Sequence, residues 1–177
     1  GISTLELDEL AERLIRECGG VPAFKGYTIS DARVPYPGTI CASVNDEVVH
    51  SIPRKDKFLR EGDIIGIDIG MWYPADATIR FSTSSQKKKT RGIIERAGLV
   101  TDMAITIGIG EISEEARRLL DATKEALEIG IRAVKPGSRV GDVSYAIQTY
   151  LDKHGLGIVR NLAGHGVGYE LHEDPAI

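Results

Sequence analysis

The stretch "AGHGVGYELHEDPAI" at residues 163–177 holds the side chains most able to do chemistry. His165 lies between glycines, His172 follows seven residues later, and Glu173 and Asp174 come directly after it. Imidazole and carboxylate groups at such spacing can bind metal ions, transfer protons or stabilise developing charge. A site of that kind needs partners from elsewhere in the chain.

Asp68 lies in the middle of "IIGIDIGMW" (64–72), a segment rich in β-branched residues that predicts a strand. Side chains alternate along a strand, so Gly66, Asp68 and Gly70 share one face and the isoleucines share the other. An aspartate is unfavourable inside a strand, and the two glycines leave open space around this one. Asp68 is therefore a candidate site residue.

Asp102 has a similar environment in "GLVTDMAITIGIG" (98–110), where it shares a face with Val100. If the two segments pair, both carboxylates face one small cavity, and their repulsion calls for a compensating divalent cation. The alternative is that one aspartate lies on an exposed edge while the other hydrogen-bonds a turn. Asp76 is a weaker candidate than Asp102, because Pro74 interrupts the strand before it.

The other two histidines carry less information. His50 ends "DEVVHSIP", just before an Ile-Pro turn, where a lone histidine is more often structural or exposed than catalytic. His154 lies at the predicted C-terminus of a helix, where the helix dipole already favours it.

The composition indicates a globular chain that is not built for nucleic acid or membranes as a whole. Its 177 residues are 42% hydrophobic with a net charge of −4, which gives no support for binding polyanions over the entire surface. No apolar run approaches the ~20 residues that a membrane-spanning helix needs. Two cysteines are too few for a disulfide framework, and no signal peptide is visible at the start, so we expect a cytoplasmic protein.

Helices and strands do not alternate regularly along the chain, which predicts an α+β fold. Helices are expected at 3–19, 113–134 and 141–155, a hairpin at 39–52, and strands at 61–73, 98–110 and 157–162. Ser3 and Glu6 fit a capping box for the first helix. The second helix is expected to bury one apolar face: Ala116, Leu119, Leu120, Thr123, Leu127 and Val134. The polar, basic segment 75–97 looks like an elaborated hairpin loop or insert without a core of its own.

Several motifs in order resemble the methionine aminopeptidases, most closely the bacterial type I enzymes of the "pita-bread" metallopeptidase fold. They are "STLELDELAERLI", "PAFKGY", "ICASVNDEVVHSIP", "LREGDIIGIDIG", "GLVTDMAITIGIGEISEEARRLL", "VKPGSRVGDV" and "GHGVGYELHEDP". The resemblance covers the chain apart from the basic segment and a few residues near "TISDARV". It implies an antiparallel sheet covered by helices, and an enzyme that removes the initiator methionine from nascent proteins.

The resemblance also assigns roles to residues. It implies two divalent metal ions (Co, Mn, Fe or Zn) held in part by Asp68, Asp102 and His165, with His50 and His172 acting on the substrate. The methionine pocket would comprise Phe24, Tyr27, Tyr36, Cys41 and Leu171. Asp102 is preferred over Asp76 as the second aspartate because "GLVTDMAIT" matches the family's motif better than "ADATIRF" does.

Two departures from the family pattern qualify this interpretation. The basic segment 75–97 separates the two aspartates, where the family has a short hairpin. The family's two metal-binding glutamates come after the "HEDP" motif, and this sequence ends there. We therefore expect residues 1–177 to be a single, incomplete catalytic domain that lacks the last strands of the fold, weakly active or inactive by itself.

Two alternative functions and one further partner, the ribosome, remain open. The chain could be a proline-type aminopeptidase of the same fold, or a non-catalytic relative that binds a partner through the same surface. In the favoured interpretation, the substrates are the N-termini of nascent polypeptides and no membrane is involved. The basic residues within 80–96 could also contact the ribosome, although a solvated loop is the favoured explanation.

Overall fold

The computed structural model describes residues 1–28, 34–84 and 91–177, and it gives the backbone alone for 77–84 and 91–97. Its elements in chain order are α1 (Thr4–Glu17), β1 (Val21–Pro22), β2 (Ile40–Val44), β3 (Ile64–Ser84), β4 (Arg91–Gly108), α2 (Glu114–Ala133), α3 (Val140–Lys153), β5 (His165–Gly166) and β6 (Glu173–Ala176). The expected α+β class is confirmed, with the strands paired antiparallel throughout the described ranges.

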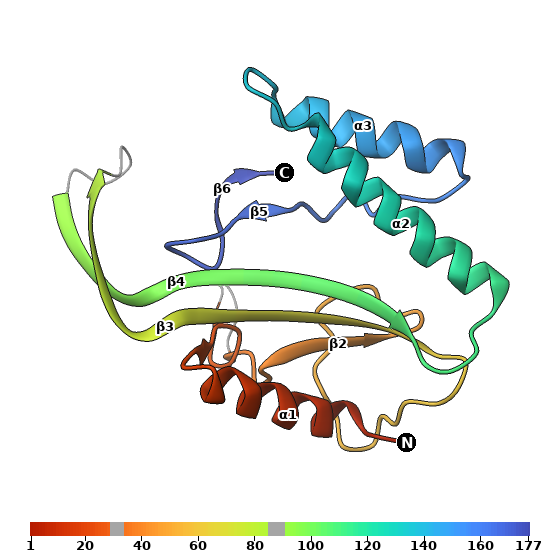
Figure 1. Cartoon of the computed structure of the whole chain (residues 1–177), viewed down its shortest axis with the longest axis horizontal. Helices are drawn as coiled ribbons and strands as arrows, with labels where there is room; N and C mark the ends of the chain where they lie inside the picture. The colour runs from red at the N-terminus through yellow and green to blue at the C-terminus, as the bar shows by residue number, and fades with distance from the viewer. Residues whose placement is uncertain (29–33, 85–90) are drawn as a thin grey trace.

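The long hairpin of β3 and β4 dominates the sheet (Figure 1). β3 pairs with the short strands β1 and β2. It also pairs with β4 along most of its length. The far end of the hairpin, which contains the basic segment, bends away from the rest of the molecule. Residues 85–90 of that segment lie outside the described residues.

Pro74 perturbs the ladder without ending the strand. The register runs from Ile64↔Gly108 to Tyr73↔Leu99, and resumes only at Thr78↔Ala97. Proline has no N–H to donate, so the ladder skips the residues around it and the hairpin bends there. The expectation that Pro74 interrupts the strand is wrong, because β3 continues to Ser84 and only its pairing with β4 shifts between Tyr73 and Thr78.

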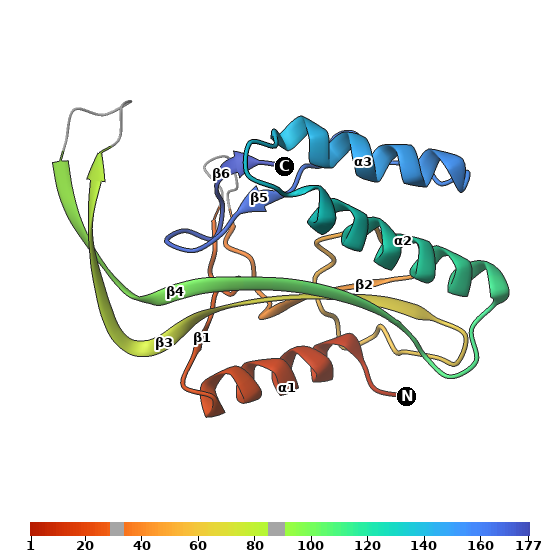
Figure 2. The same ribbon diagram turned by 45° about the horizontal axis from the view of Figure 1, so that its top comes forward.

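Helix α1 packs on one face of the sheet and α2 and α3 lie on the other side of the hairpin (Figure 2). Beneath α1 is a core of isoleucine, valine and other apolar side chains: Ile40, Ala42, Val44, Leu59 and Ile65, with Leu7, Ala11, Ile67, Ile69 and Ile109 packed against it. Asp8 of α1 ties the helix to the start of β2, because its Oδ1 accepts the N–H groups of Thr39 (2.6 Å) and Ile40 (2.9 Å). The isoleucine face of β3 therefore packs in the core beneath α1, and Asp68 lies on the opposite face of the strand.

The predicted capping box of α1 is present. The Ser3 hydroxyl accepts the Glu6 N–H at 3.2 Å, and the Glu6 carboxylate accepts the Ser3 N–H at 2.8 Å. We expect Ser3→Ala to lower the free energy of unfolding by about 1 kcal/mol, because backbone groups at the helix start lose their partner. Urea denaturation measures this. Ser144→Ala, which removes a hydroxyl from the middle of α3, is the control, and an equal loss there would contradict a specific capping effect.

The buried face of α2 differs from the predicted one. The buried residues are Ala122, Ala126 and Gly130, while Leu127 is 59% exposed and Val134 is 67% exposed. The small residues are buried because α3 packs closely against them, with Ile147 touching the position where a Gly130 side chain would be. Helical spacing alone predicted the stripe of large apolar residues, and close helix packing selected the small ones.

Two other expectations were wrong. The segment 39–52 turns back at Asn45, which has φ of 58°, but only β2 forms. The return segment meets β2 through the Ala42 N–H, which donates to the Ser51 carbonyl, and through the Ser51 N–H, which donates to the Ser43 hydroxyl. Asn45 instead uses its side chain to accept the Ile64 N–H and to donate to Asp63. Residues 157–162 form no strand, and β5 begins at His165. None of the helices in the described ranges is long and apolar enough to cross a membrane.

Candidate metal and substrate site

The pairing of β3 with β4 places the two aspartates together on one face. Asp68 is opposite Ala104, and Asp102 is opposite Gly70, so the carboxylates are diagonal neighbours. The two carboxyl groups are close enough to interact, because Asp102 raises the pKa of Asp68. The structure therefore brings together the two strand aspartates that the alternation predicted, and the exposed Asp76 lies beyond the bend of β3.

Burial and the neighbouring carboxylate alter the acidity of Asp68. Its pKa rises from 3.8 to about 7, chiefly because the site is desolvated and next because of the negative charge and hydrogen bond of Asp102. The nearby His165 opposes this rise. Two carboxylates in such contact avoid double ionisation unless a cation joins them, so the pair is suited to hold one.

His165 lies beside this pair. Its Nε2 is 3.7 Å from Oδ2 of Asp102, and the two side chains are only 30% and 18% exposed. Its Nδ1 lies 3.0 Å from the carbonyl oxygen of Gly166, which can only accept, so Nδ1 carries the proton. The lone pair of Nε2 is thus left free on the side of the carboxylates, as a metal-binding imidazole requires.

His172 lies on the other side of His165. The two ring centroids are 4.2 Å apart, and Nδ1 of His172 is 2.8 Å from the hydroxyl of Tyr27. The pKa of His172 is lowered, first by desolvation and then by the charge of His165. His172 makes no hydrogen bond or ion pair with Asp68 or Asp102, so the two histidines occupy different parts of the site.

Hydrogen bonds hold the C-terminal segment that carries both histidines against the sheet, and further hydrogen bonds form within the segment. The Val100 N–H donates to the carbonyl of Gly168 at 2.7 Å, two residues from Asp102 on β4. The carboxylate of Glu173 accepts the N–H groups of Tyr169 (3.2 Å) and Glu170 (3.1 Å). A pocket of about 420 Å³ opens beside the histidines, lined by His165, His172, Glu173, Asp174 and Ala176.

A buried apolar cluster adjoins the carboxylates, because Cys41 on β2 pairs with Asp68 and Leu171 directly precedes His172. It contains all five residues that the family resemblance gave to the methionine pocket: Phe24, Tyr27, Tyr36, Cys41 and Leu171. The pKa of the Cys41 thiol is raised, mainly by burial, so this thiol stays neutral at physiological pH. The cluster is therefore apolar and uncharged on the side that faces Asp68.

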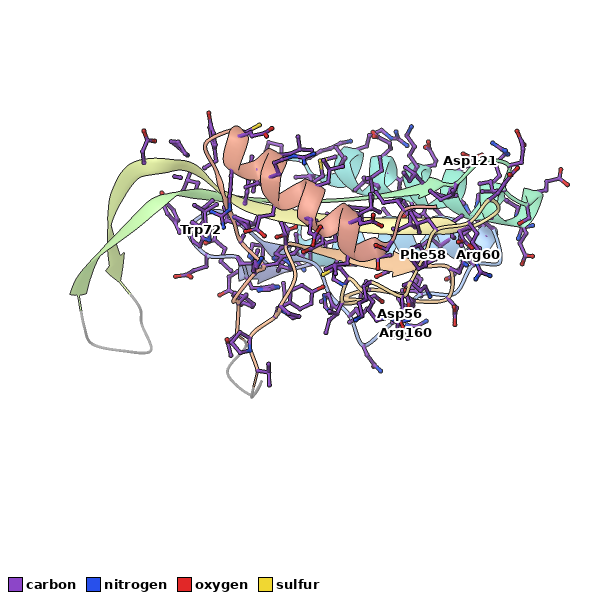
Figure 3. The ribbon with its side chains drawn as sticks, turned by 90° about the horizontal axis from the view of Figure 1, so that it is seen from below. Asp56, Phe58, Arg60, Trp72, Asp121 and Arg160 are labelled. Carbon is purple, nitrogen blue, oxygen red and sulfur yellow. The ribbon has the colours of Figure 1, made fainter. Side chains whose placement is uncertain are left out.

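Sequence reasoning missed three members of the cluster, Ala23, Val100 and Trp72. Trp72 lies where the hairpin begins to bend away from the sheet (Figure 3). Strand alternation could have found two of them, since Trp72 is two residues after Gly70 and pairs with Val100. Ala23 follows the two-residue strand β1 and has no such periodic signal.

Gly70 makes room for this cluster beside Asp102. A Cβ at position 70 would lie 2.6 Å from Cε1 of Phe24 and 3.2 Å from the Thr101 carbonyl oxygen. We expect Gly70→Ala to lower the free energy of unfolding by about 1–3 kcal/mol, because a rigid ring must move inside packed surroundings. Denaturation followed through the single tryptophan, Trp72, measures the loss and reports on the cluster itself.

Gly66 is the matched control on the same strand face. A Cβ there would meet Thr106 Oγ1 at 3.5 Å and the Ser43 carbonyl at 3.8 Å, which are ordinary contacts. Gly66→Ala is expected to change stability by less than about 1 kcal/mol. Equal losses in the two variants would show that Gly70 has no special role.

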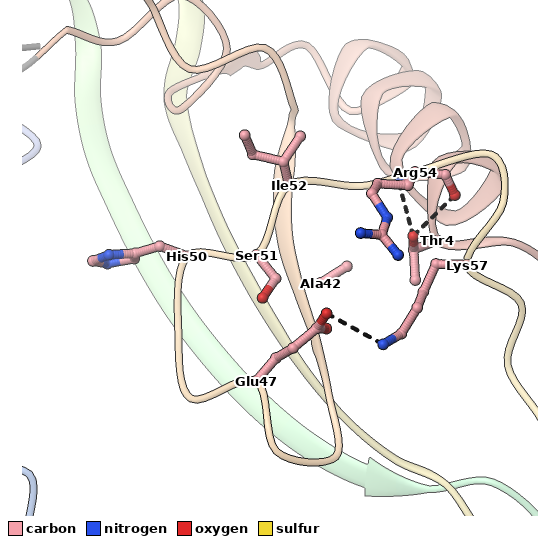
Figure 4. A pocket seen from close by; sticks show the side chains of 8 residues that line it. All are labelled: Thr4, Ala42, Glu47, His50, Ser51, Ile52, Arg54 and Lys57. Atoms are coloured by element: carbon pink, nitrogen blue, oxygen red, sulfur yellow. Dashed lines mark hydrogen bonds and ion pairs between the residues drawn. The ribbon is translucent and has the colours of Figure 1, made fainter.

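His50 occupies a separate place from the other two site histidines. It is exposed, with φ of 58°, and contributes to a pocket of about 330 Å³ between the 45–52 loop and the start of α1. Figure 4 shows its ring directed away from the Glu47–Lys57 ion pair (3.2 Å) on the far side of that pocket. Its charge still acts on His172, whose pKa it lowers slightly.

The donor atoms suit a divalent cation, although they do not yet enclose one. Carboxylate oxygens and an imidazole nitrogen are ligands that Mn²⁺, Fe²⁺, Co²⁺ and Zn²⁺ all accept. Within the described ranges, no three His, Cys, Asp or Glu side chains converge on one point as a finished metal centre. The raised pKa of Asp68 beside Asp102 nonetheless indicates that positive charge near these two carboxyl groups would be favourable.

Comparisons with known proteins agree with this picture. The methionine aminopeptidase 1 of Bacillus subtilis is 41% identical over 177 residues, which is 100% of this chain and 59% of that protein. A crystal structure of methionine aminopeptidase from Thermotoga maritima superimposes with a TM-score of 0.81 at 36% identity, covering 100% of this chain and 59% of that one. The chain thus spans about three fifths of the length of these relatives.

More distant structures share the fold alone. The Xaa-Pro dipeptidase of Bacillus anthracis superimposes with a TM-score of 0.70 at 20% identity, covering 99% of this chain and 40% of that one. The expected pita-bread fold is confirmed by these neighbours. The model of "Metallopeptidase family M24" matches residues 1–96 and 92–177, so that the two matches meet within β4. The chain therefore belongs to metallopeptidase family M24.

Proposed function

We propose that the protein is a metal-dependent aminopeptidase that removes the initiator methionine from nascent polypeptides in the cytoplasm. The observation that carries this proposal is the contact between Asp68 and Asp102 beside His165, with a buried apolar cluster on the neighbouring strand. Similarity to methionine aminopeptidases along the whole chain supports it.

Asp68, Asp102 and His165 would hold two divalent ions, of Co, Mn, Fe or Zn. When bound, such ions supply an activated water at neutral pH and polarise the scissile carbonyl. Asp68 and Asp102 would contribute carboxylate oxygens to these ions, and His165 would contribute the Nε2 that faces Asp102.

The substrate side would use the remaining residues. Phe24, Tyr27, Tyr36, Cys41 and Leu171 would enclose the methionine side chain, whose unbranched thioether suits an uncharged apolar cluster. His172 would hydrogen-bond the scissile amide or its oxyanion, and His50 would orient the substrate backbone or assist the leaving nitrogen. The lowered pKa of His172 favours a neutral imidazole for this purpose.

Metal titration followed by a peptide assay tests the proposal. The full-length protein, loaded with metal, is expected to release methionine from Met-Ala-Ser and to leave Ala-Pro peptides intact. Preference for Ala-Pro would instead identify a proline-type aminopeptidase. Failure to bind any of the four metals would eliminate the enzyme proposal and favour a non-catalytic binding protein.

The hairpin end suggests a second, separate proposal, that basic residues within 80–96 contact the ribosome. Its support is the excess of lysine and arginine there and the way the hairpin extends away from the sheet. Replacing Lys87, Lys88, Lys89 and Arg91 with alanine should weaken co-sedimentation with ribosomes at low salt. Unchanged co-sedimentation would contradict ribosome contact and favour the interpretation of 75–97 as a solvated insert.

A further inference from the structure

We propose that Tyr27 is a positioning residue whose hydroxyl donates to Nδ1 of His172 and fixes the tautomer that carries its proton on Nε2. The inference rests on the proposed function only for its catalytic consequence, because the tautomer itself can be observed without any reaction. Tyr27 would then position His172 in addition to lining the methionine pocket.

The contact joins two distant parts of the chain in a fixed geometry. The Tyr27 hydroxyl is 2.8 Å from Nδ1 of His172, and the two rings pack with centroids 5.2 Å apart and planes tilted by 45°. The backbone of Tyr27 is itself held, because its N–H donates to Phe24 (2.9 Å) and its carbonyl accepts the Tyr36 N–H (2.8 Å). The hydroxyl is therefore presented from an ordered turn and not from a free loop.

The chemistry of the two groups decides which one donates. A phenol oxygen is a weak acceptor because its lone pair is delocalised into the ring, whereas its O–H donates well. The unprotonated nitrogen of a neutral imidazole is a good acceptor. When Nδ1 of His172 accepts the Tyr27 proton, the imidazole must carry its own proton on Nε2.

His165 is held in the opposite tautomer by a different partner. Its Nδ1 donates to the Gly166 carbonyl, 3.0 Å away, so its Nε2 has a lone pair. Two rings whose centroids are 4.2 Å apart therefore present opposite groups at Nε2. His165 offers a lone pair beside Asp102, and His172 offers an N–H for a substrate oxygen.

This arrangement predicts what happens when the hydroxyl is removed. In Tyr27→Phe the ring and the apolar wall remain, but Nδ1 of His172 loses its donor and both tautomers become populated. Only the fraction protonated on Nε2 can donate to a developing oxyanion, and its orientation is no longer fixed. We expect kcat for Met-Ala-Ser to fall about 10-fold with little change in KM, since part of an oxyanion interaction worth about 100-fold or more is lost.

Nitrogen NMR of the imidazole side chains tests the assignment directly. In ¹⁵N-labelled protein at pH 8, the wild type should show His172 protonated on Nε2, with its signals identified by their disappearance in His172→Ala. Tyr27→Phe should move these signals toward the average of the two tautomers. A wild-type His172 protonated on Nδ1 would overturn the proposal without recourse to any variant.

Tyr36 provides a matched control. Its hydroxyl donates to the carbonyls of Ile40 (3.0 Å) or Ser51 (3.2 Å) and does not contact His172. Tyr36→Phe should therefore leave the His172 tautomer unchanged, and an equal effect from both variants would contradict the proposal. An effect of Tyr27→Phe on KM alone would also contradict it. Absence of peptidase activity alongside the expected tautomer would reject the proposed function and leave the Tyr27 contact intact.

Discussion

Asp68→Asn is expected to stabilise the metal-free protein at pH 8 by about 1–2 kcal/mol and to weaken Mn²⁺ binding by at least about 100-fold. The stabilisation arises because the charged carboxylate is desolvated and repelled by Asp102, and the neutral amide is not. The loss of affinity arises because the amide cannot replace an anionic ligand. Few surface substitutions would move stability and metal affinity in opposite directions.

The stabilisation should depend on pH in a defined direction. The pKa of Asp68 is raised from 3.8 to about 7 in the folded protein, so between these values the folded state binds more protons than the unfolded state. The wild type therefore loses stability as the pH rises from about 4 to about 7, and the variant does not. Its advantage should be absent near pH 4 and complete at pH 8.

Urea denaturation in EDTA at pH 4.5, 6 and 8 measures the difference. Asp76→Asn is the control, because Asp76 is an exposed aspartate on the same strand. It should change neither the pH dependence nor the metal affinity. An advantage for Asp68→Asn that is the same at every pH, or a metal affinity lost in Asp76→Asn, would refute the assignment of the pair.

Separate alanine substitutions should show that His165 acts in metal binding and that His172 acts in catalysis. His165→Ala is expected to weaken metal binding about 10-fold or more, because it removes a ligand whose Nε2 faces Asp102 at 3.7 Å. His172→Ala should leave metal affinity within about 2-fold and lower the rate of methionine release about 100- to 1,000-fold, as the loss of an oxyanion donor does. The metal effect and the rate effect are thus expected in different variants.

Isothermal titration with Mn²⁺ and release of methionine from Met-Ala-Ser measure the two properties. His154→Ala serves as the control, since His154 is exposed at the end of α3 and its Nδ1 lies 2.8 Å from the carbonyl oxygen of Tyr150 on the same helix. If His172→Ala lost as much metal affinity as His165→Ala, the two rings would form one site and the division would be wrong.

The sequence predicted the features that depend on local periodicity. The capping box at Ser3 follows from local hydrogen bonding, and it is present. The shared face of Asp68 and Asp102 follows from alternation once the two strands pair, and the register confirms it. These predictions needed no knowledge of how the elements pack.

The errors come from interactions between elements. The stripe of leucines on α2 predicted the wrong buried face because α3 approaches closely enough to require Gly130. A second strand after Asn45 did not form, and the side chain of that residue bonds to Asp63 and Ile64 across the turn. Trp72 and Val100 joined the apolar cluster through cross-strand pairing, and the Tyr27–His172 bond spans 145 residues of sequence. No local pattern contains that information.

A crystal structure of the protein with Zn²⁺, using anomalous scattering at the zinc edge, tests the central claim most directly. The account predicts anomalous density within about 2.0–2.2 Å of a carboxylate oxygen of Asp68, a carboxylate oxygen of Asp102 and Nε2 of His165. It also predicts that His172 remains bonded to Tyr27 and outside the metal shell. Zinc bound by His172 and Glu173, or by Asp76, with no zinc at Asp68 and Asp102, would contradict it.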